Sequence, residues 1–459
     1  MFKKVEIWIL YLVILMSFPI AIAFGILVRQ ELVGINKFGK LSEGALFLTE
    51  IPKTLKDIFL YRAPKEDYYL SNKLFDRFPN LNGFNGNPNS QESYLLLSKY
   101  DGDLQEGIVE LVDLTNFEVL HTWNPDIDQF NKPLRNNFEF KYLKRDKNNA
   151  RYTLRTPLLL EDGGLVFHHE SPLRKIDFCS DLVFQNTKDN FNHSIEKDID
   201  GNIWTRSYIY PQTLPISKVG RKLKKKGGFH EDGIVKLSPE GKILFEKSLP
   251  QIFIDNGLEY LLFGLARYEK DPIHLNDIQP VNFDSDYWKK GDLFLSVRNQ
   301  SMIILYRPSS NKIIWKGIGP FLRQHDVDIM DGYRISIFNN RYTNNVLKKK
   351  RVDGNNEVII YDFKTGKYSS YMQKSLSALD VRTVTEGTSQ ILPNGDMLIE
   401  ESNFGRTLYF NADGSLAWSH YNRAKDGNVY RINWSRILYE KDDINNVRKL
   451  LKSPIKCND

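Results

Sequence analysis

The longest apolar run of the chain lies near its N-terminus. Residues 7–28 carry no charged side chain, and Lys3 and Lys4 precede them. About 20 apolar residues form a helix that crosses the hydrocarbon core of a bilayer. The pattern therefore predicts a membrane anchor over residues 1–28. No later segment is long and apolar enough to cross again, so we expect a single-pass protein.

A cleaved signal peptide is the alternative interpretation of this run. Ala21-Ile22-Ala23 resembles a small-residue cleavage site. The run is longer than a typical signal core of about 7–15 residues, which favours an anchor. Basic residues are divided almost evenly between its two sides, so they do not set the orientation. The order of charge, apolar run and small residues favours a domain on the periplasmic side of the cytoplasmic membrane.

From about Glu92 onward the pattern changes to short apolar strands joined by Asp-Gly or Asn-Gly turns, which is typical of antiparallel hairpins. Such turns occur at Asp162-Gly163, Asp200-Gly201 and Asn394-Gly395, and a second hairpin follows each of them. Two successive hairpins make a four-stranded antiparallel sheet. Six such units are expected, over residues 93–123, 155–186, 193–248, 274–317, 325–372 and 387–421.

Six four-stranded units in succession predict an all-β fold, a six-bladed β-propeller that closes on itself. The apolar run at residues 432–438 is expected to complete a blade and close the ring. A β-sandwich with additional hairpins is the alternative. The predicted organisation is an anchor over 1–28, a linker and cap over 29–92 with a helix near 52–61, a propeller over 93–440 and a tail over 441–459.

Composition agrees with a folded, strand-rich protein. Charged residues make up 26% and aromatic residues 13% of the 459 residues, which excludes a disordered chain and favours strands. The net charge of +6 is weak evidence for a polyanion, and we interpret the basic runs 221–228 and 348–351 as solvated loops, with no nucleic-acid partner. The two cysteines, Cys179 and Cys457, exclude a four-thiolate zinc site and leave a single bridge open.

Three of the eight histidines occupy the same place in successive units. His193, His274 and His325 open the third, fourth and fifth units just ahead of the first hairpin, and Thr388 holds the matching position in the sixth. The innermost strand of each propeller blade lines the central channel. We therefore expect these side chains to converge in one polar ring at a channel mouth.

Two further residues are candidates for this ring. Arg298 ends a strand that follows His274, and its guanidinium suits a sulfate, phosphate or carboxylate. Asn276 lies two residues after His274 and is predicted to share its strand face. Three histidines could bind zinc, but no carboxylate is spaced to orient them, so neither a metal nor a cofactor is expected. The chain contains no phosphate-binding P-loop and no nucleophile elbow.

Four segments resemble the bacterial aryl sulfotransferase family, propeller enzymes that act outside the cytoplasm without a nucleotide sulfate donor. The segments are Phe191-Asn192-His193, His274-Leu275-Asn276-Asp277, Ser296-Val297-Arg298-Asn299-Gln300-Ser301 and Gln324-His325-Asp326. A strand ending in Asn339-Asn340 also fits, and the resemblance spans roughly residues 93–440. The chain departs from well-known members because it lacks their sizeable N-terminal β domain.

The resemblance implies that His325 is a nucleophile that forms a sulfohistidine in a ping-pong reaction. The expected partners are an aryl sulfate donor and a phenolic or other hydroxyl acceptor. His193, His274 and Arg298 would hold the sulfuryl oxygens, and one of the two histidines would move the phenol proton. Asn276 and Thr388 would complete the pocket. A non-catalytic propeller that binds a glycan or a protein, and a metal-dependent lyase or hydrolase, are the alternatives.

Overall fold

The computed structural model describes residues 6–32, 38–42, 44–45, 47–49, 72–134, 148–188, 190–215, 218, 228–264, 269–344, 350–352, 354–452 and 457. The chain divides into two compact units, Met1–Asp67 and Tyr68–Asp459. The helix predicted near 52–61 and nearly all of the basic run at 221–228 lie outside the described residues.

The first unit contains the predicted apolar helix. Helix α1 (Ile7–Leu32) includes Pro19, and its 23-residue segment Ile7–Arg29 contains an 18-residue stretch with a mean hydropathy of 2.5. This length and composition are sufficient to cross a bilayer. A signal sequence at the N-terminus has the same properties, so the helix is a membrane span or a signal sequence.

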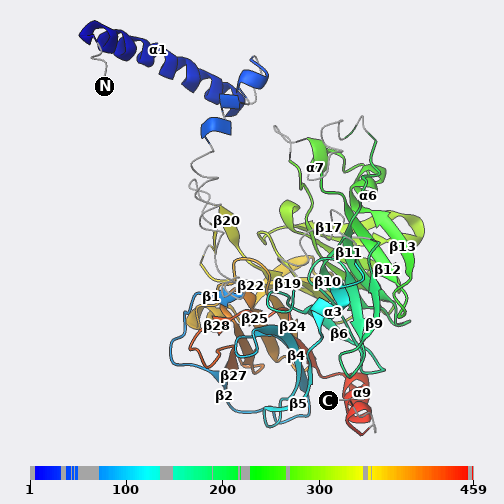
Figure 1. Cartoon of the computed structure of the whole chain (residues 1–459). Helices are drawn as coiled ribbons and strands as arrows, with labels where there is room; N and C mark the ends of the chain where they lie inside the picture. The colour runs from blue at the N-terminus through cyan, green and yellow to red at the C-terminus, as the bar shows by residue number, and fades with distance from the viewer. Residues whose placement is uncertain are drawn as a thin grey trace. The chain divides into compact units, whose positions relative to one another are not determined.

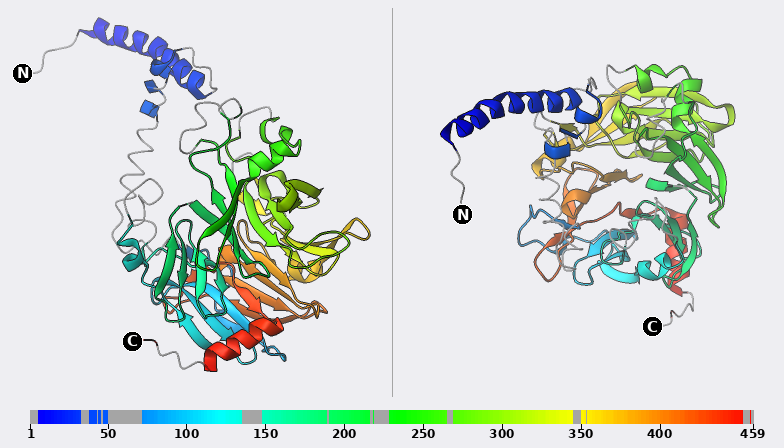
Figure 2. Two further views of the ribbon diagram at one scale, coloured as in Figure 1. Left: turned by 90° about the vertical axis from the view of Figure 1, so that its right-hand side faces the viewer. Right: turned by 45° about the horizontal axis from the view of Figure 1, so that its top comes forward.

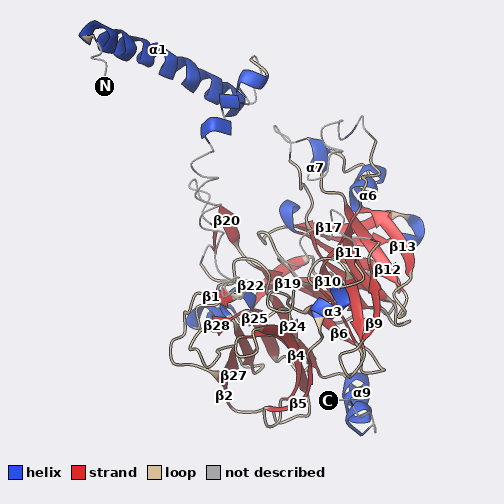
Figure 3. Ribbon diagram, viewed as in Figure 1, coloured by secondary structure: helices blue, strands red, loops and turns tan. Residues whose placement is uncertain are grey.

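Six antiparallel sheets make the second unit a six-bladed β-propeller, as the repeated hairpins predict (Figures 1 and 3). The strands of blades 2 to 4 are β6 (Arg155–Leu159), β7 (Leu165–His168), β8 (Leu173–Ile176) and β9 (Leu182–Asn186); β10 (Asn190–Lys197), β11 (Ile203–Tyr208), β12 (Asp232–Leu237) and β13 (Ile243–Ser248); and β14 (Leu275–Pro280), β15 (Leu293–Val297), β16 (Met302–Arg307) and β17 (Lys312–Ile318). The strands of blades 5 and 6 are β18 (Val327–Ile329), β19 (Arg334–Asn339), β22 (Glu357–Asp362) and β23 (Lys367–Tyr371); and β24 (Thr388–Ile391), β25 (Met397–Glu401), β26 (Arg406–Phe410) and β27 (Leu416–Tyr421).

The two ends of the second unit close the ring. Blade 1 consists of β29 (Arg436–Leu438), β3 (Tyr94–Asp101), β4 (Glu106–Asp113) and β5 (Glu118–Trp123), so the C-terminal strand supplies the first strand of the first blade. In return, β2 (Gly83–Gly86) adds a fifth strand to blade 6 beside β27, and β1 (Lys73–Leu74) pairs with β28 (Val429–Tyr430). This exchange pairs strand edges that would otherwise remain open.

Helices and short hairpins connect or cover the blades (Figure 2). They are α3 (Ile127–Asn131), α6 (Leu249–Asp255), α7 (Tyr260–Phe263), α8 (Gln373–Ala378), α9 (Lys441–Lys452), the 3₁₀ turns η2 (Arg298–Gln300), η3 (Pro308–Ser310) and η4 (Ser402–Phe404), and the hairpin β20 (Tyr342–Asn344) with β21 (Lys350–Val352). The interpretation of 348–351 as a loop is therefore wrong for Lys350 and Arg351, which belong to β21.

Turn chemistry and burial explain why the repeats fold in this way. At the turn between β24 and β25, Gly395 adopts a φ of 88°, and the Asn394 side chain accepts a hydrogen bond from the Asp396 backbone N–H at 3.0 Å. The apolar face of each sheet then packs against the next blade. Leu111 of blade 1 and Phe167 of blade 2, for example, share one buried cluster. The first strands of blades 2 to 5, β6, β10, β14 and β18, contact one another in succession, so they line the axis of the ring.

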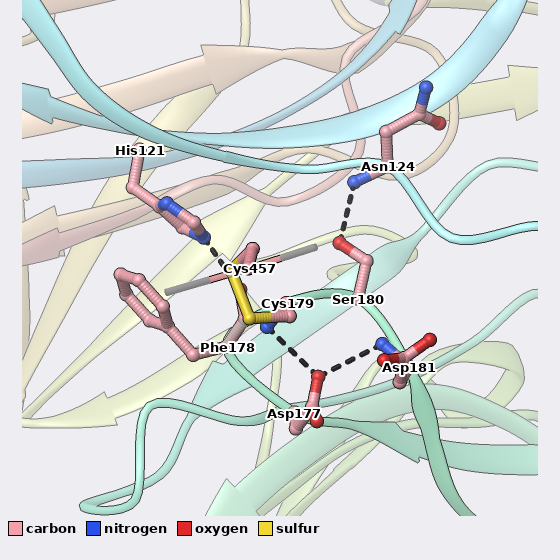
Figure 4. Close-up of a disulfide and its surroundings, with 8 residues drawn as sticks. All are labelled: His121, Asn124, Asp177, Phe178, Cys179, Ser180, Asp181 and Cys457. Carbon is pink, nitrogen blue, oxygen red and sulfur yellow. Dashed lines mark hydrogen bonds between the residues drawn. A yellow bond between two sulfur atoms is a disulfide. The ribbon is translucent and has the colours of Figure 1, made fainter. Parts of the chain in front are cut away.

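A disulfide joins Cys179 to Cys457, residues 278 positions apart (Figure 4). Cys179 lies in the turn between β8 and β9, where the Asp177 carboxylate accepts hydrogen bonds from the Cys179 and Asp181 backbone N–H groups. His121 of β5 bonds to the Phe178 carbonyl at 2.8 Å and stacks on its ring. The bridge, which the sequence left open, ties the segment after α9 to blade 2.

Candidate active site

Three histidine rings from neighbouring blades meet near the beginning of their first strands. The ring centroids of His193 and His274 are 5.1 Å apart, and those of His193 and His325 are 6.5 Å apart. His193 lies within β10, His274 directly precedes β14, and His325 lies two residues before β18. The convergence expected from their common position in the repeat is therefore present.

A left-handed backbone residue marks the entry to the first strand of every blade. In blade order these residues are Trp434, Thr156, His193, His274, Arg323 and Glu386, with φ between 47° and 67°. Residues other than glycine adopt this conformation at a cost of about 1–3 kcal/mol, and only where the surrounding structure imposes it. Because the conformation recurs around the whole ring, we attribute it to the geometry of the channel mouth.

This backbone changes the expected orientation of Asn276. A strict strand alternation would put Asn276 on the face of His274, but the register of β14 shifts between Leu275 and Asp277. The buried Asn276 amide donates to the Gln324 carbonyl at 2.9 Å, and its Oδ1 has no hydrogen-bond partner within the described part of the chain. Asn276 thus supports the residue that precedes His325.

His325 is held at both ring nitrogens. Its Nδ1 lies 2.6 Å from Asn340 Oδ1, and its Nε2 accepts a hydrogen bond from the Glu386 backbone N–H at 3.0 Å. The side chain is only 2% exposed. Burial, followed by the nearby charge of Arg298, lowers the pKa of His325 to about 3. The imidazole is therefore neutral at neutral pH, which a nucleophile requires.

His274 has a carboxylate partner instead. Asp271 Oδ2 lies 2.6 Å from His274 Nδ1, and the same oxygen lies 3.8 Å from His230 Nδ1. Burial lowers the pKa of His274, although the hydrogen bond to Asp271 opposes this shift. Burial raises the pKa of Asp271, but the hydrogen bond to His274 and the charges of His274, Arg206 and His230 together lower it to about 2. A histidine oriented by an ionised carboxylate is suited to proton transfer.

Positive charge surrounds the remaining histidine, His193. Burial and the charge of Arg206 lower the pKa of His193 well below its ordinary value. Arg298 lies in η2, where its backbone N–H donates to the His274 carbonyl at 3.1 Å, and its charge lowers the pKa of His274 and His325. The Arg298 Nε is buried without a hydrogen-bond partner among the described residues. A guanidinium with an unused donor suits an anionic group.

Arg298 shares an aromatic neighbour with a second arginine. The guanidinium carbons of Arg298 and Arg323 lie 5.4 and 4.8 Å from the ring centroid of Tyr342. Burial, followed by the charge of Arg323, lowers the pKa of Arg298. Like charges held this close together favour an anion between or beside them.

Thr388 faces a different group of side chains. Its hydroxyl donates to Asp326 Oδ2, and the Ser389 backbone N–H donates to the same oxygen at 3.1 Å. Burial raises the pKa of Asp326 to about 6. Asp326 and Thr388 line a cavity of about 360 Å³, together with Asp328, Glu196 and Arg436, and none of the three histidines lines it. Within the described ranges, the hydrogen bond of the Thr388 hydroxyl leads to Asp326, the neighbour of His325 in the chain.

The structure adds residues that the sequence did not select. Asn340 and the Glu386 backbone hold His325, and Asp271 holds His274. The Glu386 carboxylate lies 3.3 Å from Arg155 and 2.8 Å from Arg431. Burial raises the pKa of Glu386, but the charges of Arg431 and Arg155 outweigh it and hold the pKa below its ordinary value.

Some of these residues had a signal in the sequence and others had none. The prediction that no carboxylate is spaced to orient the histidines is wrong, because Asp271 lies three residues before His274 and contacts its Nδ1. Asn340 belongs to a segment that fits the family. Arg155 and Arg431 come from distant parts of the chain, so nothing local connects them with Glu386. His230, which is not among the predicted site residues, contacts the site through Asp271. Over the described ranges, no group of three or more His, Cys, Asp or Glu side chains is arranged to hold a metal ion.

A family model described as Arylsulfotransferase (ASST) matches residues 156–423, which include all six predicted site residues. No curated protein gives a significant match.

Solved structures resemble the chain only distantly. A protein of unknown function from Bacteroides caccae is 10% identical with a TM-score of 0.45, and the match covers 76% of this chain and 100% of that chain. The Pan2 WD40 domain of Neurospora crassa is 9% identical with a TM-score of 0.41, over 81% and 92% of the two chains. A streptogramin B lyase is 13% identical with a TM-score of 0.37, over 77% and 96%. Similarities this distant carry no argument about function.

Proposed function

The chain belongs to the arylsulfotransferase family, and we propose that it transfers a sulfuryl group from an aryl sulfate to a phenolic or other hydroxyl acceptor through a sulfohistidine on His325. The observation that carries this proposal is the meeting of three neutral histidines beside Arg298. Catalytic sites are places where burial and charged neighbours shift pKa values in this way.

In the first half-reaction, the lone pair of His325 Nε2 attacks the sulfur atom of the donor. An N–S bond forms, the bond between sulfur and the aryl oxygen breaks, and the phenolate leaves and takes a proton from solvent. The neutral state of His325 supports this step because a protonated ring has no lone pair to donate. The Glu386 N–H that now contacts Nε2 must move away before the sulfur can approach.

In the second half-reaction, the acceptor hydroxyl attacks the same sulfur atom. Its O–H proton passes to His274 Nε2 while the O–S bond forms and the N–S bond breaks, which restores neutral His325. His274 is better suited to this role than His193 because Asp271 holds its other nitrogen and stabilises the imidazolium that forms. His274 then loses the proton to solvent.

The sulfuryl oxygens need positive charge and hydrogen-bond donors in both steps. Arg298 is the principal candidate because its charge acts on His274 and His325 and its Nε has no partner within the described ranges. His193 would donate a second hydrogen bond. Donors that are already in place when charge develops commonly contribute about 10²–10³-fold to the rate. Asn276 and Thr388 would act indirectly, through Gln324 and Asp326.

We also propose that α1 anchors the protein in the cytoplasmic membrane with the propeller on the periplasmic side. The length and hydropathy of Ile7–Arg29 support the anchor. The disulfide between Cys179 and Cys457 supports the location, because such bonds persist in oxidising compartments. Sequencing the N-terminus of the membrane-bound protein tests the anchor, since a mature chain beginning at Phe24 would contradict it.

The test of the transfer reaction is intact-mass spectrometry of the full-length protein after incubation with p-nitrophenyl sulfate. The wild type should gain the mass of one sulfuryl group and release nitrophenol, and His325→Ala should do neither. His420→Asn is the matched control, because His420 is also buried with a pKa near 3 but lies on the outer strand β27. An unmodified wild type without nitrophenol release would refute the proposal for this donor.

A further inference from the structure

We propose that Asn340 is a positioning residue that holds His325 in the Nδ1–H tautomer and thereby selects Nε2 as the attacking nitrogen. The role rests on the proposed function of His325, but the tautomer itself can be measured without any reaction. Asn340 is fully buried at the end of blade 5's second strand, directly after β19.

The orientation of the Asn340 amide follows from its other partners. Its Nδ2 donates to the carbonyl oxygens of Glu386 at 2.8 Å and Thr383 at 3.2 Å. Carbonyl oxygens only accept hydrogen bonds, so the NH₂ end must face them and Oδ1 must face His325. Because Oδ1 also only accepts, the His325 Nδ1 that lies 2.6 Å away carries the hydrogen.

The opposite side of the ring agrees with this assignment. The Glu386 backbone N–H donates to Nε2 at 3.0 Å, which requires a lone pair on that nitrogen. One ring nitrogen thus faces a group that can only accept a hydrogen bond and the other faces a group that can only donate one, and both contacts indicate the same tautomer. One segment, Thr383 to Glu386, supplies the acceptors for Asn340 and the donor for His325.

A second buried asparagine keeps this segment in place. Asn356 Nδ2 donates at 2.9 Å to both the Asn340 and the Thr383 carbonyl oxygens, and its Oδ1 accepts a hydrogen bond from the Thr383 backbone N–H at 2.5 Å. The control substitution is therefore made at Asn422, a buried asparagine whose Nδ2 donates to the Tyr100 carbonyl oxygen at 2.9 Å, away from the Thr383–Glu386 segment.

The amide has a chemical consequence that a carboxylate would not have. His274 faces the carboxylate of Asp271, which stabilises a positive ring, whereas His325 faces a neutral amide. In a sulfohistidine with the hydrogen on Nδ1, the ring carries positive charge and the sulfuryl group carries negative charge. A neutral partner stabilises that ring less than a carboxylate does, so the N–S bond stays reactive toward the acceptor. We infer that the two histidines differ in role because their partners differ in charge.

The first measurement is the tautomer of His325 in the full-length wild-type protein, by NMR of ¹⁵N-labelled histidine with His325→Gln to assign the signals. The expected result is a protonated Nδ1 and an unprotonated Nε2 at neutral pH. A ring protonated at Nε2, or at both nitrogens, would overturn the proposal. This measurement needs no variant of Asn340, so a failure of such a variant to fold does not affect it.

The second measurement compares Asn340→Asp with Asn422→Asp. Asn340→Asp should raise the pKa of His325 by one unit or more, because a carboxylate on Nδ1 favours the charged ring by about the 1.4 kcal/mol that one unit represents. It should also lengthen the lifetime of the sulfohistidine about tenfold after donor is removed. Asn422→Asp should do neither. An unchanged pKa in folded Asn340→Asp, or equal shifts in both variants, would overturn the proposal.

The two proposals fail in different ways. If the wild type forms no adduct while its tautomer is as expected, the transfer function fails and the positioning by Asn340 stands. If the adduct forms on a ring of the other tautomer, the transfer function stands and the role of Asn340 is refuted.

Discussion

Replacing Cys179 and Cys457 together by serine would remove the covalent link between blade 2 and the segment after α9. The link closes a loop of 278 residues that contains four complete blades, β10 to β27. In the chain-entropy description, a crosslink of this span stabilises the folded state by about 5.6 kcal/mol at 25 °C by restricting the unfolded chain. Measured values are commonly about 2–4 kcal/mol, because unfolded chains retain structure.

Two non-covalent contacts remain when the bridge is lost. The pairing of β29 with β3 still closes the ring, and Val447 and Leu450 of α9 still pack into the cluster between blades 1 and 2. We therefore expect the double variant to fold, with a free energy of unfolding lowered by about 2–5 kcal/mol.

The assay is urea unfolding of the full-length protein in detergent, with and without reductant. Loss of the bridge should move the midpoint to lower urea, on the order of 1 M for a slope of a few kcal/mol per molar. The slope should also rise, because the uncrosslinked chain exposes more surface when it unfolds. Reductant should reproduce the shift in the wild type and have no effect on the double variant. Equal midpoints for the oxidised wild type and the double variant would refute the entropic reasoning.

Three further predictions concern the site. Asp271→Asn should slow transfer to the acceptor by about 10²–10⁴-fold while adduct formation on His325 changes much less. Single-turnover measurements separate the two half-reactions, and equal losses of rate in the two would argue against His274 as the base. Arg298→Lys should slow adduct formation by about 10²-fold with the fold intact, because an ammonium cannot replace the guanidinium fork, and a rate equal to that of the wild type would exclude the anion-binding role. The pKa of His325 is about 3 in the folded state against an ordinary 6.5. As the pH falls, the unfolded chain therefore takes up a proton first, and this group makes the folded state less stable from about pH 6.5 downward. Melting temperatures of the wild type and His325→Gln should therefore converge between pH 7 and pH 4, although the raised pKa of Asp326 acts in the opposite direction in both proteins.

The sequence determined those features that depend on local and repeating patterns. Local sequence patterns are sufficient to find four features, because each is built from neighbours in the chain. They are the uncharged run of α1, the Asp-Gly and Asn-Gly turns, the six four-stranded units and the closing strand near residue 437. The repeat also placed His193, His274 and His325 at equivalent positions. In a ring, equivalent positions converge on one axis, so their proximity followed from the blade pattern.

Only the tertiary structure decided what each histidine contacts and how its backbone is turned. Strand alternation predicts Asn276 on the face of His274, whereas the structure adds a register shift between Leu275 and Asp277 and a hydrogen bond from the Asn276 amide to the Gln324 carbonyl. Glu386 reaches His325 from the next blade, and Cys457 reaches Cys179 across 278 residues. Packing of neighbouring blades brings the first pair together and closure of the ring brings the second, and no local pattern encodes either. Burial then lowers the pKa of the histidines, because removing water disfavours the charged ring, and burial exists only once the blades have packed.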